Sequence, residues 1–363
     1  MESLNTNQKT LAWLNSARGI SHGKISKLLE YFGSPKEIWD NFQDEKNNLP
    51  FLKAETISYL CKSKNHFEEI LLQRLHKEKA RIVTIYDKEY PIKLKQINGS
   101  PYLLYYKGSL ENINNISIAV VGSRKATAYG KWAAEKFTKE LTEMGVNIIS
   151  GLAVGIDTVA HKTALKFSGR TYGIIGCGIN VVYPKKNEEL FKQISIRGGI
   201  ITEYPFDMVP VASNFHDRNR IISGLSDGVL VIEAQERSGT LITAGHAADQ
   251  GREIFAVPGN IDSLYSKGTN SLIRDGAKIT ASVTDIIEEI HGLKEKVKTP
   301  PIDYSKLSAT ELMIINSIKE GRVTIDELEQ TTSIKAGQLL SHLTILEMKG
   351  FISQIPGNRF ILN

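Results

Sequence analysis

Residues 117–124, SIAVVGSR, place a short apolar run directly before a glycine-containing turn. The same order of apolar run, Gly-rich turn and helix-like segment repeats up to Ala277. Such alternation predicts an α/β fold whose mostly parallel sheet is covered by helices on both faces. Apolar runs such as Val229–Ile232 are typical of strands buried on both faces.

The apolar runs give the predicted strands: Ile118–Val121, Val146–Ser150, Thr171–Ile175, Ile200–Glu203, Val229–Glu233 and Ile254–Val257. Segments of helical periodicity lie between them, for instance Ala133–Met144, Thr158–Phe167 and Thr240–Gln250.

The flanks of this core have different patterns. Residues 1–80 are predicted to be helical, and residues 81–291 form the core together with a Tyr- and Pro-containing strap at its start. A Lys- and Pro-rich linker is expected at 292–306. Residues 307–363 predict three helices and a β-hairpin wing with a turn at 356–358, which is typical of a winged-helix domain.

Near the N-terminus, Gly19 and Gly23 mark a turn between two helices, with Lys24 and Lys27 close behind. The element resembles the helix-hairpin-helix of DNA-binding proteins, whose turn amides face a phosphate. The alternative is an ordinary pair of packed helices.

Composition narrows the class of protein. The chain has 363 residues, a formal charge of +5 and two cysteines, and its sequence pI is near 8.9. The cysteines have no metal-ligand spacing, and the N-terminus has no signal-peptide pattern. We expect a cytoplasmic protein without a membrane segment, and the mildly basic charge favours a nucleic acid or nucleotide partner only weakly.

Several turns at strand ends carry ligand-binding residue types. In an open parallel sheet, ligands bind beyond the carboxyl ends of the strands. Glycines let a ligand approach the backbone, and arginine suits phosphate. We expect these turns to line a phosphate-binding trough: Gly122, Ser123 and Arg124; Gly151 and Gly155; Ser238, Gly239 and Thr240. None fits the dinucleotide fingerprint or the P-loop, so we expect no cofactor.

A further candidate is the segment from Phe215 to Ser226, which we expect to open a helix near Asn214. Cations at a helix start oppose the helix dipole, and an anionic ligand would relieve that conflict. Phe215, Arg218, Asn219 and Ile222 share one helical face. Phe215 could stack on a base while Arg218 or Arg220 holds a phosphate, as in single-strand binding. Alternatively, Phe215 is a hydrophobic staple and Arg218 pairs with Asp217 or Glu203.

Candidates for catalysis are few. Asp157 and His161 lie four residues apart, and a structural role for His161 is favoured over that of a general base. Glu203 and Glu233 end two predicted strands and could be acid–base groups, but binding of amides or arginines is favoured. No metal-ligand spacing is present in the sequence.

Taken together, these motifs resemble the DNA-processing protein A family (DprA, also called Smf). The motifs that carry the resemblance are Val121-Gly122-Ser123-Arg124 with Tyr129-Gly130, Ser150-Gly151-Leu152-Ala153-x-Gly155-Ile156-Asp157 with Ala160-His161, Gly176-x-Gly178 with Tyr183-Pro184, Asn214-Phe215-x-x-Arg218-Asn219-Arg220 through Ser226, Ser238-Gly239-Thr240-Leu241-x-Thr243-Ala244, Val257-Pro258-Gly259 and Gly268-Thr269-Asn270. They cover about residues 85–285 in order.

The resemblance implies an extended Rossmann-like domain that binds single-stranded DNA in a basic pocket. Because the residues offer no convincing nucleophile, metal site or general base, we expect a protein without enzymatic activity. The resemblance also implies a homodimer that helps to load the recombinase RecA on incoming DNA during natural transformation. By similarity, Gly122 to Arg124 would grip phosphate, and Phe215 to Arg220 would hold base and backbone. Many relatives have a lysine three residues before this phenylalanine, whereas this chain has Ala212.

Two alternatives stay open. Phosphoribohydrolases of the related Rossmann-like superfamily cleave an N-glycosidic bond, but their Pro-Gly-Gly-x-Gly-Thr signature is only partly present at Ser238-Gly239-Thr240. The other is a duplex DNA-binding winged helix, which the scarcity of basic residues in the third helix, 334–349, disfavours.

Overall fold

A mixed β-sheet forms the centre of the protein in the computed structural model, which describes residues 3–293, 307–355 and 358–362. Contacts divide the chain into two compact units, Met1–Val297 and Lys298–Asn363. Within the described residues, the first unit contains one nine-stranded sheet. Its strands are β1 (Ala80–Thr84), β2 (Leu103–Gly108), β3 (Ser117–Val121), β4 (Asn147–Ser150), β5 (Thr171–Ile174), β6 (Gly199–Thr202), β7 (Gly228–Val231), β8 (Glu253–Ala256) and β9 (Lys278–Ile279).

The strand order, β1-β2-β6-β5-β4-β3-β7-β8-β9, explains where a ligand can bind. From β3 to β6 the chain adds strands in one direction, and it then returns to place β7 on the other side of β3. The strands from β6 to β9 are parallel, so β3 and β7 both end at the same edge of the sheet. The gap beyond β3 and β7 is therefore the switch point, where open α/β sheets bind their ligands.

The predicted strands are confirmed, with ends that differ by one or two residues. Every residue from β3 to β7 that belongs to a strand is buried, as expected for strands covered on both faces. The predicted strap is itself part of the sheet, because β2 pairs antiparallel with both β1 and β6. We did not predict β1, β2 or the two-residue β9.

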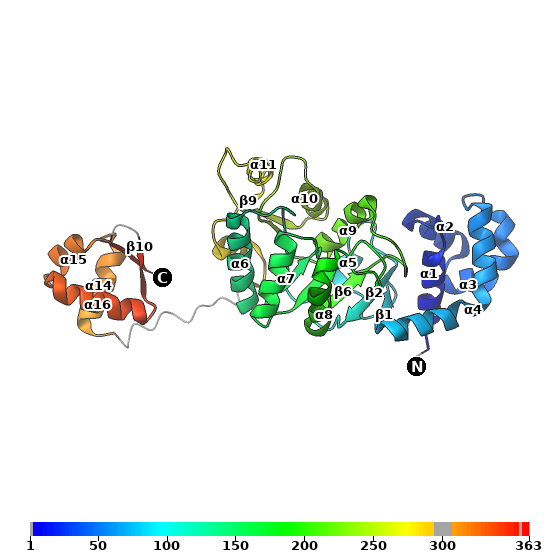
Figure 1. Cartoon of the computed structure of the whole chain (residues 1–363), viewed down its shortest axis with the longest axis horizontal. Helices are drawn as coiled ribbons and strands as arrows, with labels where there is room; N and C mark the ends of the chain where they lie inside the picture. The colour runs from blue at the N-terminus through cyan, green and yellow to red at the C-terminus, as the bar shows by residue number, and fades with distance from the viewer. Residues whose placement is uncertain (1–2, 294–306, 356–357, 363) are drawn as a thin grey trace. The chain divides into compact units, whose positions relative to one another are not determined.

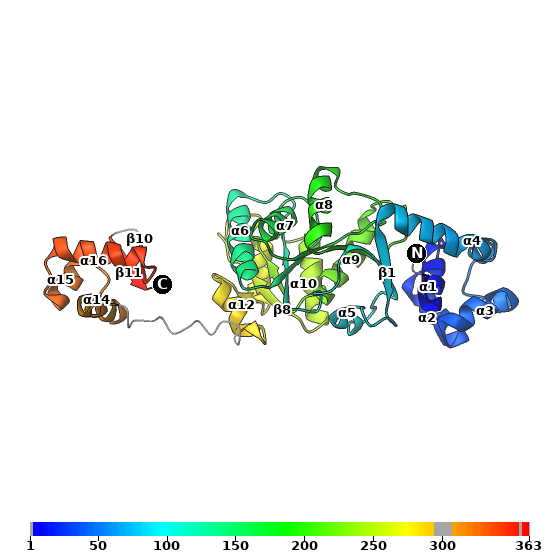
Figure 2. The ribbon, with the colours of Figure 1, turned by 90° about the horizontal axis from the view of Figure 1, so that it is seen from below.

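Helices cover both faces of this sheet (Figures 1 and 2). The helices α6, α7 and α8 lie on one face, and α5, α9 and α10 lie on the other (Figure 2). The core helices are α5 (Ile92–Lys95), α6 (Ala128–Glu143), α7 (Ile156–Lys166), α8 (Glu188–Arg197), α9 (Ala212–Gly224), α10 (Gly239–Asp249), α11 (Lys267–Arg274) and α12 (Val283–Glu289).

The N-terminal helices pack against the antiparallel edge of the sheet. They are α1 (Thr6–Ser16), α2 (His22–Phe32), α3 (Pro35–Glu45) and α4 (Ala54–Glu78). Trp13 is fully buried among them, and its indole N–H donates to the Leu60 carbonyl at 3.2 Å. Because α1 and α4 also contact β1, these helices share one hydrophobic cluster with the sheet.

The turn between α1 and α2 makes contacts within the protein. Gly19 has a φ of +87°, and Lys24 Nζ donates to its carbonyl at 2.8 Å. His22 stacks on Tyr102 and contacts the Ser100 carbonyl at 3.0 Å. These contacts fit a packed pair of helices, and phosphate binding by this turn stays a prediction.

The second unit has the predicted three helices and wing: α14 (Ala309–Lys319), α15 (Ile325–Thr332), α16 (Ala336–Met348), β10 (Ile352–Ile355) and β11 (Arg359–Leu362). Ser308 and Thr324 both form capping boxes, which fix the starts of α14 and α15. Most of the predicted linker, and residues 356–357 of the predicted turn, lie outside the described residues. Within the described ranges, no helix is long and apolar enough to cross a membrane.

We expect Gly108→Ala to weaken the join between the antiparallel and parallel parts of the sheet. Gly108 has a φ of +93°, and an added Cβ would lie 2.3 Å from the Gly198 carbonyl oxygen. Gly145 is the matched control, since its φ is +73° and a Cβ there has nothing within 4 Å. Gly145→Ala should cost about 1–2 kcal/mol of unfolding free energy, and Gly108→Ala about 2 kcal/mol more. Urea unfolding of the two variants measures this difference, and equal losses would show that the clash has no effect.

Candidate functional site

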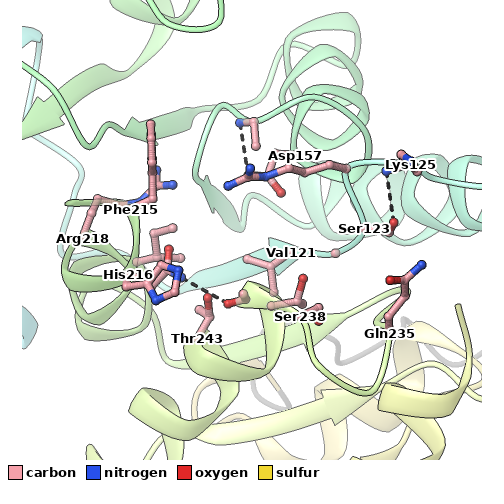
Figure 3. A pocket seen from close by; sticks show the side chains of 17 residues that line it. Val121, Ser123, Lys125, Asp157, Phe215, His216, Arg218, Gln235, Ser238 and Thr243 are labelled. Atoms are coloured by element: carbon pink, nitrogen blue, oxygen red, sulfur yellow. Dashed lines mark hydrogen bonds between the residues drawn. The ribbon is translucent and has the colours of Figure 1, made fainter. Parts of the chain in front are cut away.

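A pocket of about 410 Å³ opens at the switch point between β3 and β7. It is lined by the turn after β3, one face of α9, and the loop that leads from β7 into α10. In Figure 3, Phe215 and Arg218 lie on one side of the pocket, and Ser123 and Lys125 lie on the opposite side. The lining includes these predicted site residues: Gly122, Ser123, Arg124, Phe215, Arg218, Asn219, Ser238, Gly239 and Thr240.

Arg124 and Lys125 give the mouth of the pocket its positive charge. Both side chains are exposed, and within the described ranges neither forms an ion pair. The Lys125 amide donates to Ser123 Oγ at 3.1 Å, which folds the turn back on itself. Because no carboxylate neutralises these two cations, they are free to attract an anionic ligand.

Phe215 lies close to two guanidinium groups. The Cζ atoms of Arg124 and Arg218 lie 5.9 Å and 5.7 Å from the centre of its ring. The ring of Tyr183, which is 47% exposed, lies 5.5 Å away at a tilt of 36°. The half-buried phenyl ring is therefore part of an aromatic and cationic surface on which a planar group can stack.

Arg218 is buried beneath this ring, with an exposed fraction of 4%. Its Nη1 donates to the Gly151 carbonyl at 2.8 Å and to the Ile174 carbonyl. It therefore joins the ends of β4 and β5, and neither Asp217 nor Glu203 is its partner, contrary to one of our alternatives. A Cβ at Gly151 would lie 2.7 Å from Nη1, so a glycine is needed there.

Asp157 is the carboxylate that faces Arg218. Its Oδ2 accepts from the amides of Gly151 and Ala153 at 3.1 and 3.3 Å. Burial raises the pKa of Asp157 to about 6, although the charge of Arg218 and the two amides act in the opposite direction. Arg218 stays charged at neutral pH, because burial lowers its pKa only to about 10.

The predicted place of the arginines in their helix is wrong. We expected them at a helix start, but α9 begins at Ala212, so Arg218 and Arg220 lie beyond its first turn. The dipole effect is confined to the end turns of a helix, and it therefore gives no reason for these arginines. Arg218 lies on the helical face shared with Phe215, Asn219 and Ile222, and that whole face lines the pocket.

Arg220 does not line the pocket. Its Nη2 contacts Glu203 Oε2 at 2.5 Å, and both side chains are 17% exposed. Arg220 follows Arg218 by two residues, a spacing that turns it to another side of α9. Its contact with Glu203 ties α9 to the segment after β6.

Gly151 and Gly155 do not line the pocket, but they support residues that do. Gly155 has a φ of +88°, and an added Cβ would lie 2.2 Å from the Ser123 carbonyl oxygen. That carbonyl accepts from the Ile156 amide at 3.2 Å, at the start of α7. The close approach of Gly155 therefore holds the Gly122 to Arg124 turn in place.

The other acid–base candidates have structural contacts, as the favoured interpretation predicted. Glu233 accepts from the amide and hydroxyl of Thr127 at the N-cap of α6. His161 is fully buried, and its Nδ1 contacts Thr171 Oγ1 at 2.7 Å, while burial lowers its pKa to about 3. It does not pair with Asp157.

The predicted site left out several lining residues: Lys125, His216, Gln235 and Thr243. Asp157, which also lines the pocket, was considered only as a catalytic candidate. Lys125 directly follows a predicted site residue, and its charge was a usable signal. Ser238 Oγ is buried and has no hydrogen-bond partner within the described part of the chain. A polar atom at the wall of a pocket without a partner is suited to binding a ligand.

The pocket thus combines exposed cations, an aromatic surface and an unpaired hydroxyl. Cations bind phosphates, and aromatic rings stack on bases. In the described ranges, no group of three or more His, Cys, Asp or Glu side chains could hold a metal ion. The arrangement fits a chain of linked nucleotides better than a compact polar metabolite.

Known proteins match both units. Residues 81–291 match the family model described as DNA recombination-mediator protein A, and residues 298–358 match that of the DprA winged helix domain. The DNA processing protein DprA of Bacillus subtilis (strain 168) is 43% identical over 209 residues, which are 57% of this chain and 70% of that protein.

Two solved structures are also similar. That of DNA processing protein A from Streptococcus pneumoniae has a TM-score of 0.62 and 35% identity, over 80% of this chain and 99% of that one. That of DNA processing protein A from Helicobacter pylori has a TM-score of 0.52 and 28% identity, over 57% and 94%. The second structure is described as giving insights into a single-stranded DNA binding mode.

The raised pKa of Asp157 predicts a pH dependence of stability. An unfolded aspartate ionises near pH 3.9, whereas the folded carboxyl keeps its proton until about pH 6. Between these values the folded state binds more protons, so the free energy of unfolding falls as the pH rises. The protonated Asp157 carboxyl therefore stabilises the fold fully below pH 4, and this stabilisation is lost above pH 6. The free energy of unfolding should fall by about 2–3 kcal/mol between these limits.

Urea unfolding of the wild type and of Asp157→Asn between pH 4 and 7.5 measures this contribution. The wild type should lose stability relative to the variant across that range, and parallel pH profiles would contradict the assignment.

Proposed function

The chain belongs to the DNA recombination-mediator protein A family, as its motifs predicted, and we propose that its pocket binds single-stranded DNA in recombination and DNA uptake. The similarity to the Helicobacter pylori protein, described as binding single-stranded DNA, supports this proposal. The observation that carries it is the half-buried Phe215 ring, which has the guanidinium carbons of Arg124 and Arg218 5.9 Å and 5.7 Å from its centre. Stacking surfaces next to cations hold single strands without reading their sequence.

Each part of the pocket has a role in this proposal. Arg124 and Lys125 bind successive phosphates at the mouth, while a base stacks on Phe215 beside Tyr183. Arg218 contributes positive potential from below, and Ser238 Oγ binds a polar atom of the base or sugar. Lys125 also offers a replacement for the lysine that many relatives have where this chain has Ala212, which is exposed at the start of α9.

Membership of the family suggests two protein partners, a second copy of the chain and the recombinase RecA. We infer that the chain acts as a homodimer and helps to load RecA on the bound strand during natural transformation. A protein that binds a few nucleotides through their backbone leaves the rest of the strand accessible to a second protein. Such binding is compatible with the loading of RecA on the same strand.

An enzymatic role is the alternative, with hydrolysis of a nucleotide at its N-glycosidic bond. Asp157 is the one carboxylate among the lining residues in the described ranges. Its acceptor oxygen is occupied by two backbone amides, and its charge faces Arg218. These contacts favour binding over catalysis. Incubation of the protein with AMP tests the alternative, since release of free adenine would support the enzyme.

We expect Arg124→Ala to weaken binding of single-stranded DNA without lowering stability. The loss of one charge-assisted phosphate contact should cost about 1.5–3 kcal/mol. It should also reduce the slope of log K against log salt by roughly 0.7. Fluorescence anisotropy of labelled oligo-dT measures both, with a matching duplex as competitor.

Arg220→Ala is the matched control for Arg124→Ala. It removes the same charge from the protein, but it leaves Glu203 without its ion-pair partner outside the pocket. We expect a loss of about 1–3 kcal/mol in unfolding free energy, with the salt slope of the wild type. Equal effects of the two variants on affinity and slope would mean that the turn after β3 is not the phosphate site.

Phe215→Ala tests base stacking. If a base stacks on the ring, the variant should lose about 1–3 kcal/mol of binding free energy. The loss should not depend on salt concentration, because no phosphate contact is removed. A variant that binds oligo-dT as the wild type does would show that the ring has only a packing role.

A further inference from the structure

We propose that the exposed side of α6 extends the DNA-binding surface beyond the pocket and carries a second segment of the single strand. This inference rests on the proposed function and adds a second contact region to it. The residues concerned are Tyr129, Trp132 and Lys136, followed by Phe167 with Lys139 and Lys166. We call this set the α6 track.

Trp132 is the centre of the α6 track. Its side chain is 57% exposed, and Tyr129 on the preceding turn is 47% exposed. The two ring centres are 5.9 Å apart, and Lys136 Nζ lies 5.6 Å from the Trp132 ring. Residues three and four apart adjoin on a helix surface, so the three side chains form a continuous strip of two rings and a cation.

Packing of the core does not account for Trp132. The side of α6 that packs on the sheet carries Ala133, Ala134, Phe137 and Leu141, all buried in one hydrophobic cluster. Trp132 is not part of that cluster. An exposed tryptophan beside a lysine offers a ring on which a base can stack and a cation for the adjoining phosphate.

The strip continues onto the neighbouring helix. Phe167, at the end of α7, has Lys139 Nζ of α6 5.2 Å from its ring centre and Lys166 Nζ 5.3 Å from it. The helices α6 and α7 pack side by side (Figure 1). A second aromatic ring flanked by cations therefore follows the first along the same layer of the protein.

The charges favour a nucleic acid over a protein as the ligand of this strip. The acidic neighbours Glu135 and Glu143 are already paired, with Lys166 at 3.1 Å and Lys139 at 3.9 Å. Within the described ranges, Lys131 and Lys136 form no ion pair. The Trp132 ring beside the unpaired Lys136 matches a base next to its phosphate in a single strand, whereas Lys139 and Lys166 beside Phe167 share their charge with the two glutamates.

The α6 track begins at the mouth of the pocket. Arg124 and Lys125 stand at that mouth, Thr127 caps α6, and Tyr129 is in its first turn. The Tyr129 hydroxyl donates to the Pro258 carbonyl at 3.2 Å, which fixes the ring in place. A strand that leaves the pocket past Arg124 and Lys125 reaches Tyr129 first and Trp132 next, and α6 is about 24 Å long at 1.5 Å per residue.

The test compares two lengths of oligo-dT. Single-strand sites span roughly 4–16 nucleotides, so an oligomer of about 5 nucleotides fills the pocket and one of about 20 nucleotides also covers the track. We expect Trp132→Ala to leave the affinity for the short oligomer unchanged. It should weaken binding of the long one by about 5- to 150-fold, the effect of losing one stacked base.

Two control variants and one fluorescence measurement sharpen this test. Trp132→Phe keeps an aromatic ring and should restore most of the affinity for the long oligomer. Tyr86→Ala removes a ring of similar exposure, 49%, in the loop after β1 and should change neither affinity. Trp13 is fully buried and Trp39 is partly buried, so quenching of tryptophan fluorescence by the long oligomer should disappear in Trp132→Phe.

The results distinguish this inference from the proposed function. If the wild type binds the short oligomer but Trp132→Ala binds both lengths as the wild type does, the α6 track is overturned and the pocket stands. A Trp132→Ala variant that loses self-association in sedimentation, with its length dependence intact, would assign the face to a contact between copies and overturn the inference. If the wild type binds neither oligomer, the proposed function fails as well.

Discussion

The change of direction between β3 and β7 is the constraint on which the site depends. The chain leaves β3 for α6 on one face of the sheet, and it leaves β7 for α10 on the other (Figure 2). Two loops that diverge from neighbouring strands cannot cover the edge between them, and an open pocket results. The helix α9 precedes β7 and presents Phe215 and Arg218 to this opening.

Positive charge at the pocket is divided between two kinds of arginine. Arg218 is held by strand-end carbonyls and by the field of Asp157, so it fixes the floor and cannot move to meet a ligand. Arg124 is exposed and free to adapt. Fixed polar groups bind at a small cost in lost freedom, whereas mobile cations tolerate a varied ligand. The combination suits a polymer that is recognised by its backbone and not by its order of bases.

Much of this could be predicted from local patterns, and the errors have physical causes. Apolar runs revealed the buried strands because a strand covered by helices on both faces needs apolar side chains on both sides. The antiparallel pair β1 and β2 was missed because its place depends on pairing with β6, which periodicity cannot show. Gly-rich turns marked the edge of the sheet at which the pocket lies, but the strand order that creates the gap is a property of the whole chain.

The arginines of α9 also show what local sequence patterns cannot predict, here within one helix. Their type suggested an anion, yet only the start of α9 at Ala212 and its rotation against the sheet decide which arginine faces the pocket. The Val211 side chain does not cap this helix, so the sequence had no cap signal that marked the start. Arg220 was therefore predicted to be in a site that it supports only through Glu203.

The two edge strands of the sheet, β1 and β9, affect a different property, the resistance of the protein to aggregation. At one end β1 is packed against α1 and α4, and at the other β9 has only two residues, Lys278 and Ile279. Lys278 forms a 2.6 Å ion pair with Glu289 beside that short edge. Long, flat and uncharged edge strands recruit further strands from other molecules, and short or covered edges do not. Copies of this protein can therefore be concentrated without their sheets joining edge to edge.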